Sequence, residues 1–97
     1  MMPDRSRGLS QDEAEGLAIQ CLSLIAEDVD GLGRFLSTTG LGPETLRTAA
    51  QEPGFLLSVI EYVLADESLL LLASERLNIR PTLFAVARHK LGRGFDE

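Results

Sequence analysis

Large aromatic side chains are scarce in this sequence. It has no tryptophan, one tyrosine and four phenylalanines among 97 residues, so its core has to be mainly aliphatic. Leucine and alanine are strong helix formers, and the β-branched residues that favour strands are sparse. The composition therefore predicts an all-α chain, and the length is typical of one domain. We expect a compact orthogonal bundle of five or six short helices around a central apolar helix.

Cysteine and histidine occur once each, as Cys21 and His89. A single cysteine excludes an intrachain disulfide, and a dedicated transition-metal site needs several such ligands. Cys21 falls on the apolar stripe of its helix, where we expect an inert core thiol. His89 lies near the end of the last helix, where a solvated side chain is expected.

The sequence also lacks a recognisable catalytic or calcium-binding pattern. The segment Asp28–Gly31 begins like an EF-hand loop, but Leu32 and Thr39 occupy positions that need an oxygen ligand and a glutamate. Carboxylates that are adjacent in a helical sequence point in different directions, so they do not form an acid–base pair. We predict no metal, no cofactor and no enzymatic activity.

No apolar run is long enough to cross a bilayer. The most apolar stretch, Pro53–Leu77, is interrupted by acidic residues, whereas a spanning helix needs about 20 apolar residues. We therefore expect no membrane association. The lone cysteine and the absence of a signal-peptide pattern predict a cytoplasmic protein.

Positive charge is in deficit and unevenly placed, and the net charge is −6. Twelve acidic residues lie between Leu9 and Glu75, against only Arg34 and Arg47. The segment from 76 to 95 has no acidic residue and carries five bases: Arg76, Arg80, Arg88, Lys90 and Arg93. One interpretation is internal, with a basic last helix beside acidic neighbours and its bases near the negative end of the helix dipole. The other is a basic patch for an acidic protein or a phosphate backbone.

Local signals divide the first half of the chain into helices. Residues 1–8 have no apolar period, and we predict a disordered tail. Ser10 and Glu13 form the Ser-x-x-Glu pattern of a capping box. The apolar stripe of that first helix comprises Ala14, Leu17, Ala18, Cys21, Ile25 and Val29. Asp30 is the expected N-cap of a second helix ending at Gly40, and a third runs from Pro43 to about Gln51.

The second half contains the most apolar helices. The expected central helix, about Pro53–Leu64, is apolar nearly all round, which predicts burial on most sides. A fifth helix follows over about Glu67–Leu77, with Asn78 as a left-handed cap. Pro81 should begin a sixth helix, which ends at Gly92 and Gly94. The resulting domain covers residues 9–94, and residues 95–97 form a short C-terminal tail.

Two leucines exceed what the inward face of the fifth helix requires. Leu71 and Leu72 fall on the side of Ser68, Glu75 and Arg76, which should face water. Either the first or the sixth helix covers them, or they form an apolar patch that seats a partner or a second copy. The candidate interface is therefore Leu71, Leu72 and Glu75.

Two runs of sequence resemble a known family. The Thr39–Arg47 run contains Gly-Leu-Gly-Pro-Glu-Thr-Leu-Arg, and the second run combines Pro53-Gly-Phe with Asp66-Glu-Ser. Together they resemble a family of small uncharacterised bacterial proteins, best represented in alphaproteobacteria and known only as a domain of unknown function. The resemblance covers roughly Ala14 to Leu91. It implies a short, helical, cytoplasmic protein of a Gram-negative bacterium, and brings no activity, cofactor or catalytic residue.

The sequence therefore favours an interaction role over chemistry. The leading hypothesis is a non-enzymatic module that associates with itself or with another protein. The alternative is a nucleic-acid-associated regulator that uses the basic last helix, although the acidic chain repels nucleic acid at long range. A small-ligand binder or an enzyme ranks third.

Overall fold

The computed structural model describes the backbone of residues 9–96 and their side chains, except those of residues 43, 46, 53 and 93–96. The tail predicted for residues 1–8 lies outside the described residues. Six helices fill the described range, and no strand occurs in it. The prediction of a small all-α bundle is confirmed.

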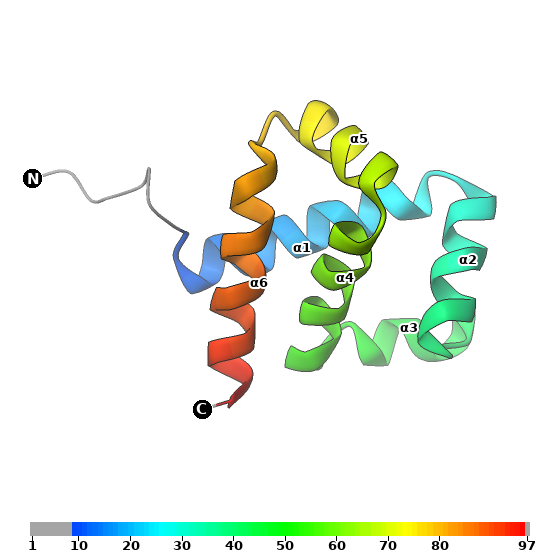
Figure 1. Ribbon diagram of the computed structural model, residues 1–97. Helices are drawn as coiled ribbons and strands as arrows, with labels where there is room; N and C mark the ends of the chain where they lie inside the picture. Colours follow the sequence, from blue (N-terminus) through cyan, green and yellow to red (C-terminus); the bar gives the residue numbers. More distant parts are fainter. Residues whose placement is uncertain (1–8, 97) are drawn as a thin grey trace, which may run out of the picture.

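The helices follow one another through short connections (Figure 1). They are α1 (Gln11–Ala26), α2 (Val29–Thr39), α3 (Pro43–Ala49), α4 (Pro53–Ala65), α5 (Glu67–Leu77) and α6 (Pro81–Asp96). No helix within residues 9–96 combines the length and the apolar character needed to cross a membrane.

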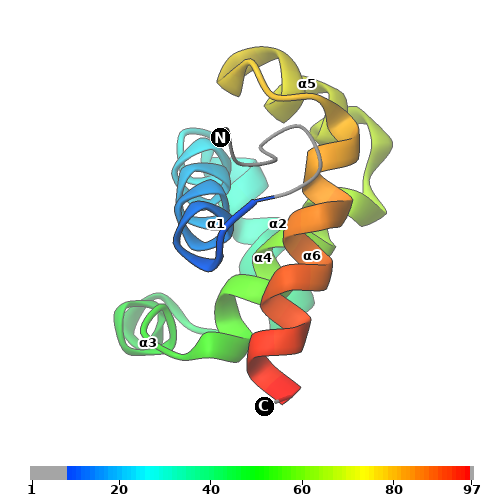
Figure 2. The same cartoon turned by 90° about the vertical axis from the view of Figure 1, so that its left-hand side faces the viewer.

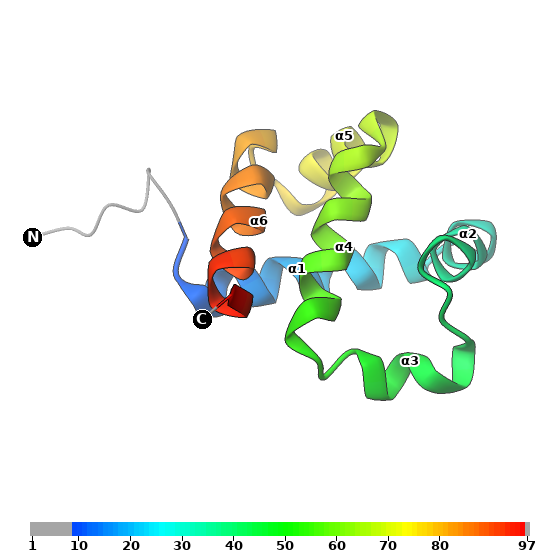
Figure 3. The ribbon, with the colours of Figure 1, turned by 60° about the horizontal axis from the view of Figure 1, so that its bottom comes forward.

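Three helices make the centre of the molecule. α4 and α6 lie side by side, and α1 crosses both of them (Figures 1 and 2). α5 connects the end of α4 to the start of α6 above this trio, and α2 packs beside the C-terminal end of α1 (Figure 1). α3 lies apart as a peripheral link between α2 and α4 (Figure 3). The prediction of a central fourth helix is therefore confirmed.

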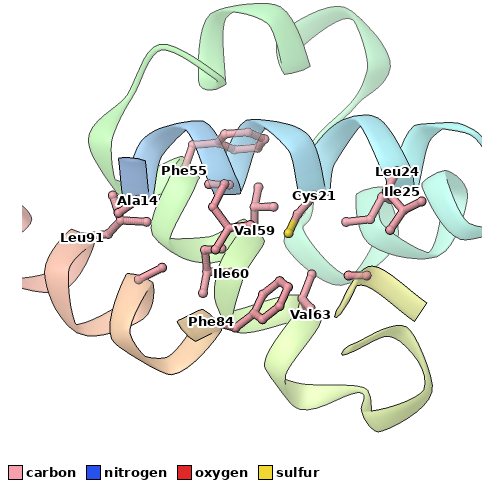
Figure 4. Packing of buried hydrophobic residues seen from close by; sticks show 14 of the residues in the cluster. Ala14, Cys21, Leu24, Ile25, Phe55, Val59, Ile60, Val63, Phe84 and Leu91 are labelled. Atoms are coloured by element: carbon pink, nitrogen blue, oxygen red, sulfur yellow. The ribbon is translucent and has the colours of Figure 1, made fainter. Parts of the chain in front are cut away.

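The core is aliphatic with a small aromatic group at one end. Val59, Ile60 and Val63 of α4 are fully buried together with Cys21 of α1 and Phe84 of α6, and this cluster lies between the helices (Figure 4). Towards α2, the ring of Phe35 meets Phe55 and Tyr62 edge-on, with centroid distances of 6.0 and 5.0 Å. Such edge-to-face pairs add about 0.5–1.5 kcal/mol each beyond area burial. They fasten α2 to α4.

Three of the predicted helix-end signals are confirmed: the capping box at Ser10 and the left-handed caps at Gly40 and Asn78. The Ser10 hydroxyl accepts from the Glu13 N–H at 3.0 Å, and the Glu13 carboxylate accepts from the Ser10 N–H at 2.9 Å. Gly40 and Asn78 both adopt the left-handed conformation, with φ values of 77° and 58°. Each allows the next residue to bond back into the preceding helix, which satisfies an end carbonyl.

The start of α2 differs from the prediction. Its N-cap is Asp28 rather than Asp30, because the Asp28 carboxylate accepts from the Gly31 N–H at 3.2 Å. The stripe of α1 consequently stops before Val29, which occupies the first position of α2 and is 84% exposed. The expectation that Val29 joins the buried face of the first helix is therefore wrong.

The end of the last helix also differs. α6 continues through Gly92 and Gly94 to Asp96, so the predicted stop at these glycines is wrong. Within the described chain, the residues with a left-handed backbone are Gly40 and Asn78, and Gly92 is not among them. A glycine that keeps helical dihedrals only weakens a helix, by about 0.5–1 kcal/mol relative to alanine.

Candidate functional site

The outward side of α5 exposes both leucines of the candidate interface. Leu71 is 53% exposed and Leu72 is 44% exposed, so neither α1 nor α6 covers them. The inward side is already filled, because Ala73 is fully buried and Leu69, Leu70 and Leu77 pack against the core. Covering these two leucines is not required for this fold, and the covered alternative is wrong.

The two leucines face different surroundings. Adjacent helical residues are about 100° apart around the axis. Leu71 shares its side of α5 with Glu75, one turn later and also exposed. Leu72 turns towards α1 and α2 and lines a hollow there. The candidate interface of Leu71, Leu72 and Glu75 therefore spans two adjoining surfaces.

The hollow beside Leu72 lies where α1 meets α2 and α4 meets α5. It measures about 130 Å³. Its polar lining includes Asp28, Asp66, Arg34 and Tyr62, and its apolar lining includes Leu24 and Leu69. Asp28 and Asp66 are both N-caps, each accepting a backbone N–H at 3.2 Å. These carboxylates therefore serve helix starts, and no group of three or more potential metal-ligating residues occurs among the described residues.

Two further hollows follow α1 on the same side. A hollow of about 210 Å³ lies between α1 and the end of α5, where it is lined by Ile19, Leu24 and Leu77. A larger one of about 500 Å³ lies between the start of α1 and the start of α6, where it is lined by Leu9, Leu17, Ile19, Ile79 and Leu83. The 210 Å³ hollow shares Leu24 with the hollow beside Leu72. It shares Ile19 and Gln20 with the 500 Å³ hollow. We call the three together the α1 groove.

The predicted basic patch is divided in the structure. Arg76 binds Glu27 of α1, with 3.0 Å between Nη2 and Oε1, and both side chains are about half exposed. An exposed pair of this kind contributes less than about 1 kcal/mol. Among the described side chains, Arg76 is the basic residue with an acidic partner, and it belongs to α5. None of the described bases of α6 forms the ion pair that the internal interpretation expects.

The two described bases of α6, Arg88 and Lys90, point in different directions. Arg88 and Lys90 are two residues apart, which places them about 200° apart around the helix. Arg80 lies before the helix and is exposed, and the Arg93 side chain lies outside the described ones. The two described bases within α6 therefore do not share one face, which reduces the support for a phosphate-binding surface.

The comparisons with known proteins identify the family. A family model described as a protein of unknown function, DUF3572, matches residues 11–94. The chain belongs to the DUF3572 family. The match runs from the first residue of α1 into the last turns of α6, so it includes all the residues named above for these surfaces except Leu9. No curated protein and no solved structure gives a significant match.

The potentially reactive side chains of this DUF3572 domain do not meet. Cys21 is fully buried, as predicted, and burial raises the pKa of its thiol to about 12. His89 is exposed on α6, also as predicted. A thiol that stays protonated is a poor nucleophile, so Cys21 acts as a packing residue.

Sequence reasoning missed Ile19. It lies away from the apolar stripe of α1 and is 54% exposed, although it is a large apolar residue. The available signal was its position between Glu15 and Ser23, which lie one helical turn away on either side, but single exposed apolar residues are common. Only the positions of α5 and α6 reveal that Ile19 borders two hollows.

Proposed function

We propose that this DUF3572 domain is a non-enzymatic protein-interaction module and that the outward side of α5 is a contact surface. The observation that carries the proposal is the exposure of Leu71 and Leu72 next to each other on a helix whose inward side is complete. Contiguous apolar surface with a polar border is typical of interaction sites. The border here includes Ser68 and Glu75, which are both exposed.

The energetic gain of covering these leucines is modest but useful. Full burial of a leucine is worth about 1.5–3 kcal/mol, and each of these is about half exposed. A partner that covers both would gain about 2 kcal/mol from them. Their contribution therefore suits a contact that also draws on neighbouring surfaces.

The non-enzymatic part of the proposal is supported by the occupation of the polar groups. Asp28 and Asp66 accept backbone N–H groups at helix starts, and Glu13 closes a capping box. Cys21 is buried within the core. Each of these side chains has a structural role that explains its position.

The test uses a double variant and a matched control. Leu71→Glu/Leu72→Glu replaces the proposed contact, and Val29→Glu changes an 84% exposed apolar residue on a different helix, α2. We expect the wild type and Val29→Glu to share one assembly, measured by light scattering at rising concentration or by co-purification from the native cell. The double variant should remain folded by circular dichroism and lose that assembly.

Two outcomes separate the versions of the proposal. Concentration-dependent dimers that the double variant abolishes support self-association. A monomeric wild type with a co-purifying protein that only the double variant loses supports a different partner. A monomeric wild type whose co-purifying proteins are the same in all three chains would refute the proposal.

A further inference from the structure

We propose that the α1 groove binds a basic amphipathic helix of a partner protein. The proposal rests on the interaction function proposed above and adds the surface and the chemistry of the partner. Its physical basis is a row of three hollows along one helix that share lining residues, two exposed apolar residues among them, and a surplus of acidic side chains in their lining.

The groove is long enough for a helix. Its lining includes Glu13, Gln20 and Glu27, which are spaced seven residues apart along one edge of α1. At a rise of 1.5 Å per residue, this edge extends for about 21 Å, or about four helical turns. α5 and the start of α6 border the groove opposite that edge, since α1 runs past both of them (Figure 1).

The apolar residues of the groove are spaced at intervals along α1. Leu17 and Leu24 of α1, again seven residues apart, contribute to successive hollows. Ile19 lies where the larger two hollows meet, and Leu72 lies in the third. A partner helix presents apolar side chains at similar intervals, because residues i and i+7 share one face. Its anchors can therefore enter successive hollows and cover Ile19 and Leu72.

The charges favour a basic partner. Four acidic residues line the hollows, namely Glu13, Glu27, Asp28 and Asp66, against the two bases Arg34 and Arg76. Arg76 already binds Glu27 across the groove. The whole chain has a net charge of −6, which attracts a basic partner and repels an acidic one at long range.

The described residues of a second copy of this chain do not supply such a helix. Its basic helix is α6, whose apolar side chains Phe84, Ala87 and Leu91 are buried in its own core. Exposing them would require the copy to unfold. The occupant is therefore a segment of a different protein, with apolar residues on one face and lysine or arginine on the other.

The experiment measures binding of a synthetic helical peptide to the full chain by fluorescence anisotropy. The peptide has leucines at helical spacing and lysines elsewhere, and a control peptide has glutamates in place of the lysines. Ile19→Glu disrupts the groove, and Val29→Glu is its matched control because it also places one negative charge at an exposed apolar site outside the hollows.

We expect the lysine peptide to bind and the glutamate peptide not to bind. Ile19→Glu should weaken binding about tenfold, since it removes one apolar contact and puts a charge in its place. Val29→Glu and Leu71→Glu should leave it unchanged or slightly stronger, because neither residue lines a hollow. Amide chemical shifts should change along α1 and at Leu72.

Other results would overturn the proposal. Equal effects of Ile19→Glu and Val29→Glu on peptide affinity would show that the binding depends only on general charge attraction. Amide chemical-shift changes confined to Leu71 and Glu75 would place the contact on the outward side of α5. That result would refute binding in the α1 groove and leave the proposed interaction function standing. Loss of the native assembly in Leu71→Glu tests that function separately, because Leu71 lines none of the three hollows.

Discussion

Ile60→Ala tests whether packing around α4 supplies a large part of the stability of the fold. Ile60 is fully buried in the cluster that joins α4 to its neighbours, together with Phe84 (Figure 4). The substitution keeps a helix-forming residue at this position, so the change measured is mainly the loss of packing. A large loss of stability is expected.

The magnitude follows from the atoms removed. Isoleucine has three more carbon atoms than alanine, and each is worth about 0.8 kcal/mol on transfer from water, giving about 2.4 kcal/mol. If a void of roughly 60 Å³ persists, it adds about 1.5 kcal/mol at about 24 cal/mol per Å³. The free energy of unfolding should therefore fall by about 4 kcal/mol, out of the roughly 5–15 kcal/mol usual for a domain.

Ile19→Ala is the matched control, because it makes the same chemical change on another helix at a residue that is 54% exposed. About half of the transfer term applies there, and alanine regains a few tenths of a kcal/mol in helix propensity. Its cost should stay below about 1 kcal/mol. Urea unfolding with a common m-value measures both. Equal losses in the two variants, or a loss below about 1 kcal/mol for Ile60→Ala, would refute the central role of α4.

Two further predictions concern backbone conformation and the buried thiol. Gly40→Ala should destabilise the chain by about 1 kcal/mol because Gly40 has a left-handed φ of 77°. Gly33→Ala should stabilise it by about 0.5–1 kcal/mol, since the added Cβ meets no atom within 4 Å inside α2; thermal melts that shift in the same direction would contradict this pair. Burial raises the pKa of Cys21 to about 12, so its contribution to stability is complete below the pKa of an unfolded thiol, about 8.5, and declines as the pH rises towards 12. Denaturant unfolding at pH 7 and at alkaline pH should show a steeper loss for the wild type than for Cys21→Ala, and parallel curves would contradict the assignment.

The parts of the fold that depend on neighbouring residues could be predicted from the sequence. The capping box of Ser10 and the left-handed positions Gly40 and Asn78 each need only a few adjacent residues. The centrality of α4 also followed from its composition, because a helix apolar nearly all round has to be buried. The caps were correct because each depends only on residues within a few positions of it.

The errors arose where two local signals compete. Asp28 and Asp30 are both good N-caps, and the choice between them determines whether Val29 ends one helix or starts the next. The structure uses Asp28, and the helix that starts there brings Phe35 into the ring contacts with Phe55 and Tyr62. Gly92 was ambiguous for a similar reason, because glycine ends a helix only when it adopts the left-handed conformation.

The candidate surfaces depend on tertiary structure to different degrees. The sequence already singled out Leu71 and Leu72, because the inward face of α5 is complete without them. It did not predict the α1 groove, since a hollow exists only where α5 and α6 leave one side of α1 uncovered. The spacing of Glu13, Gln20 and Glu27 was visible, but its meaning depends on what lies opposite.

Leu72 connects the two proposed contact surfaces. It belongs to the exposed pair on α5 and also lines the hollow at the end of the α1 groove. A substitution at Leu72 alone therefore cannot distinguish one surface from the other. Leu71 and Ile19 can, because Leu71 lines none of the three hollows and Ile19 is on a different helix from the pair. If a single partner covers both surfaces, Leu71→Glu and Ile19→Glu should each weaken its binding, and their effects should add because the two residues share no hollow.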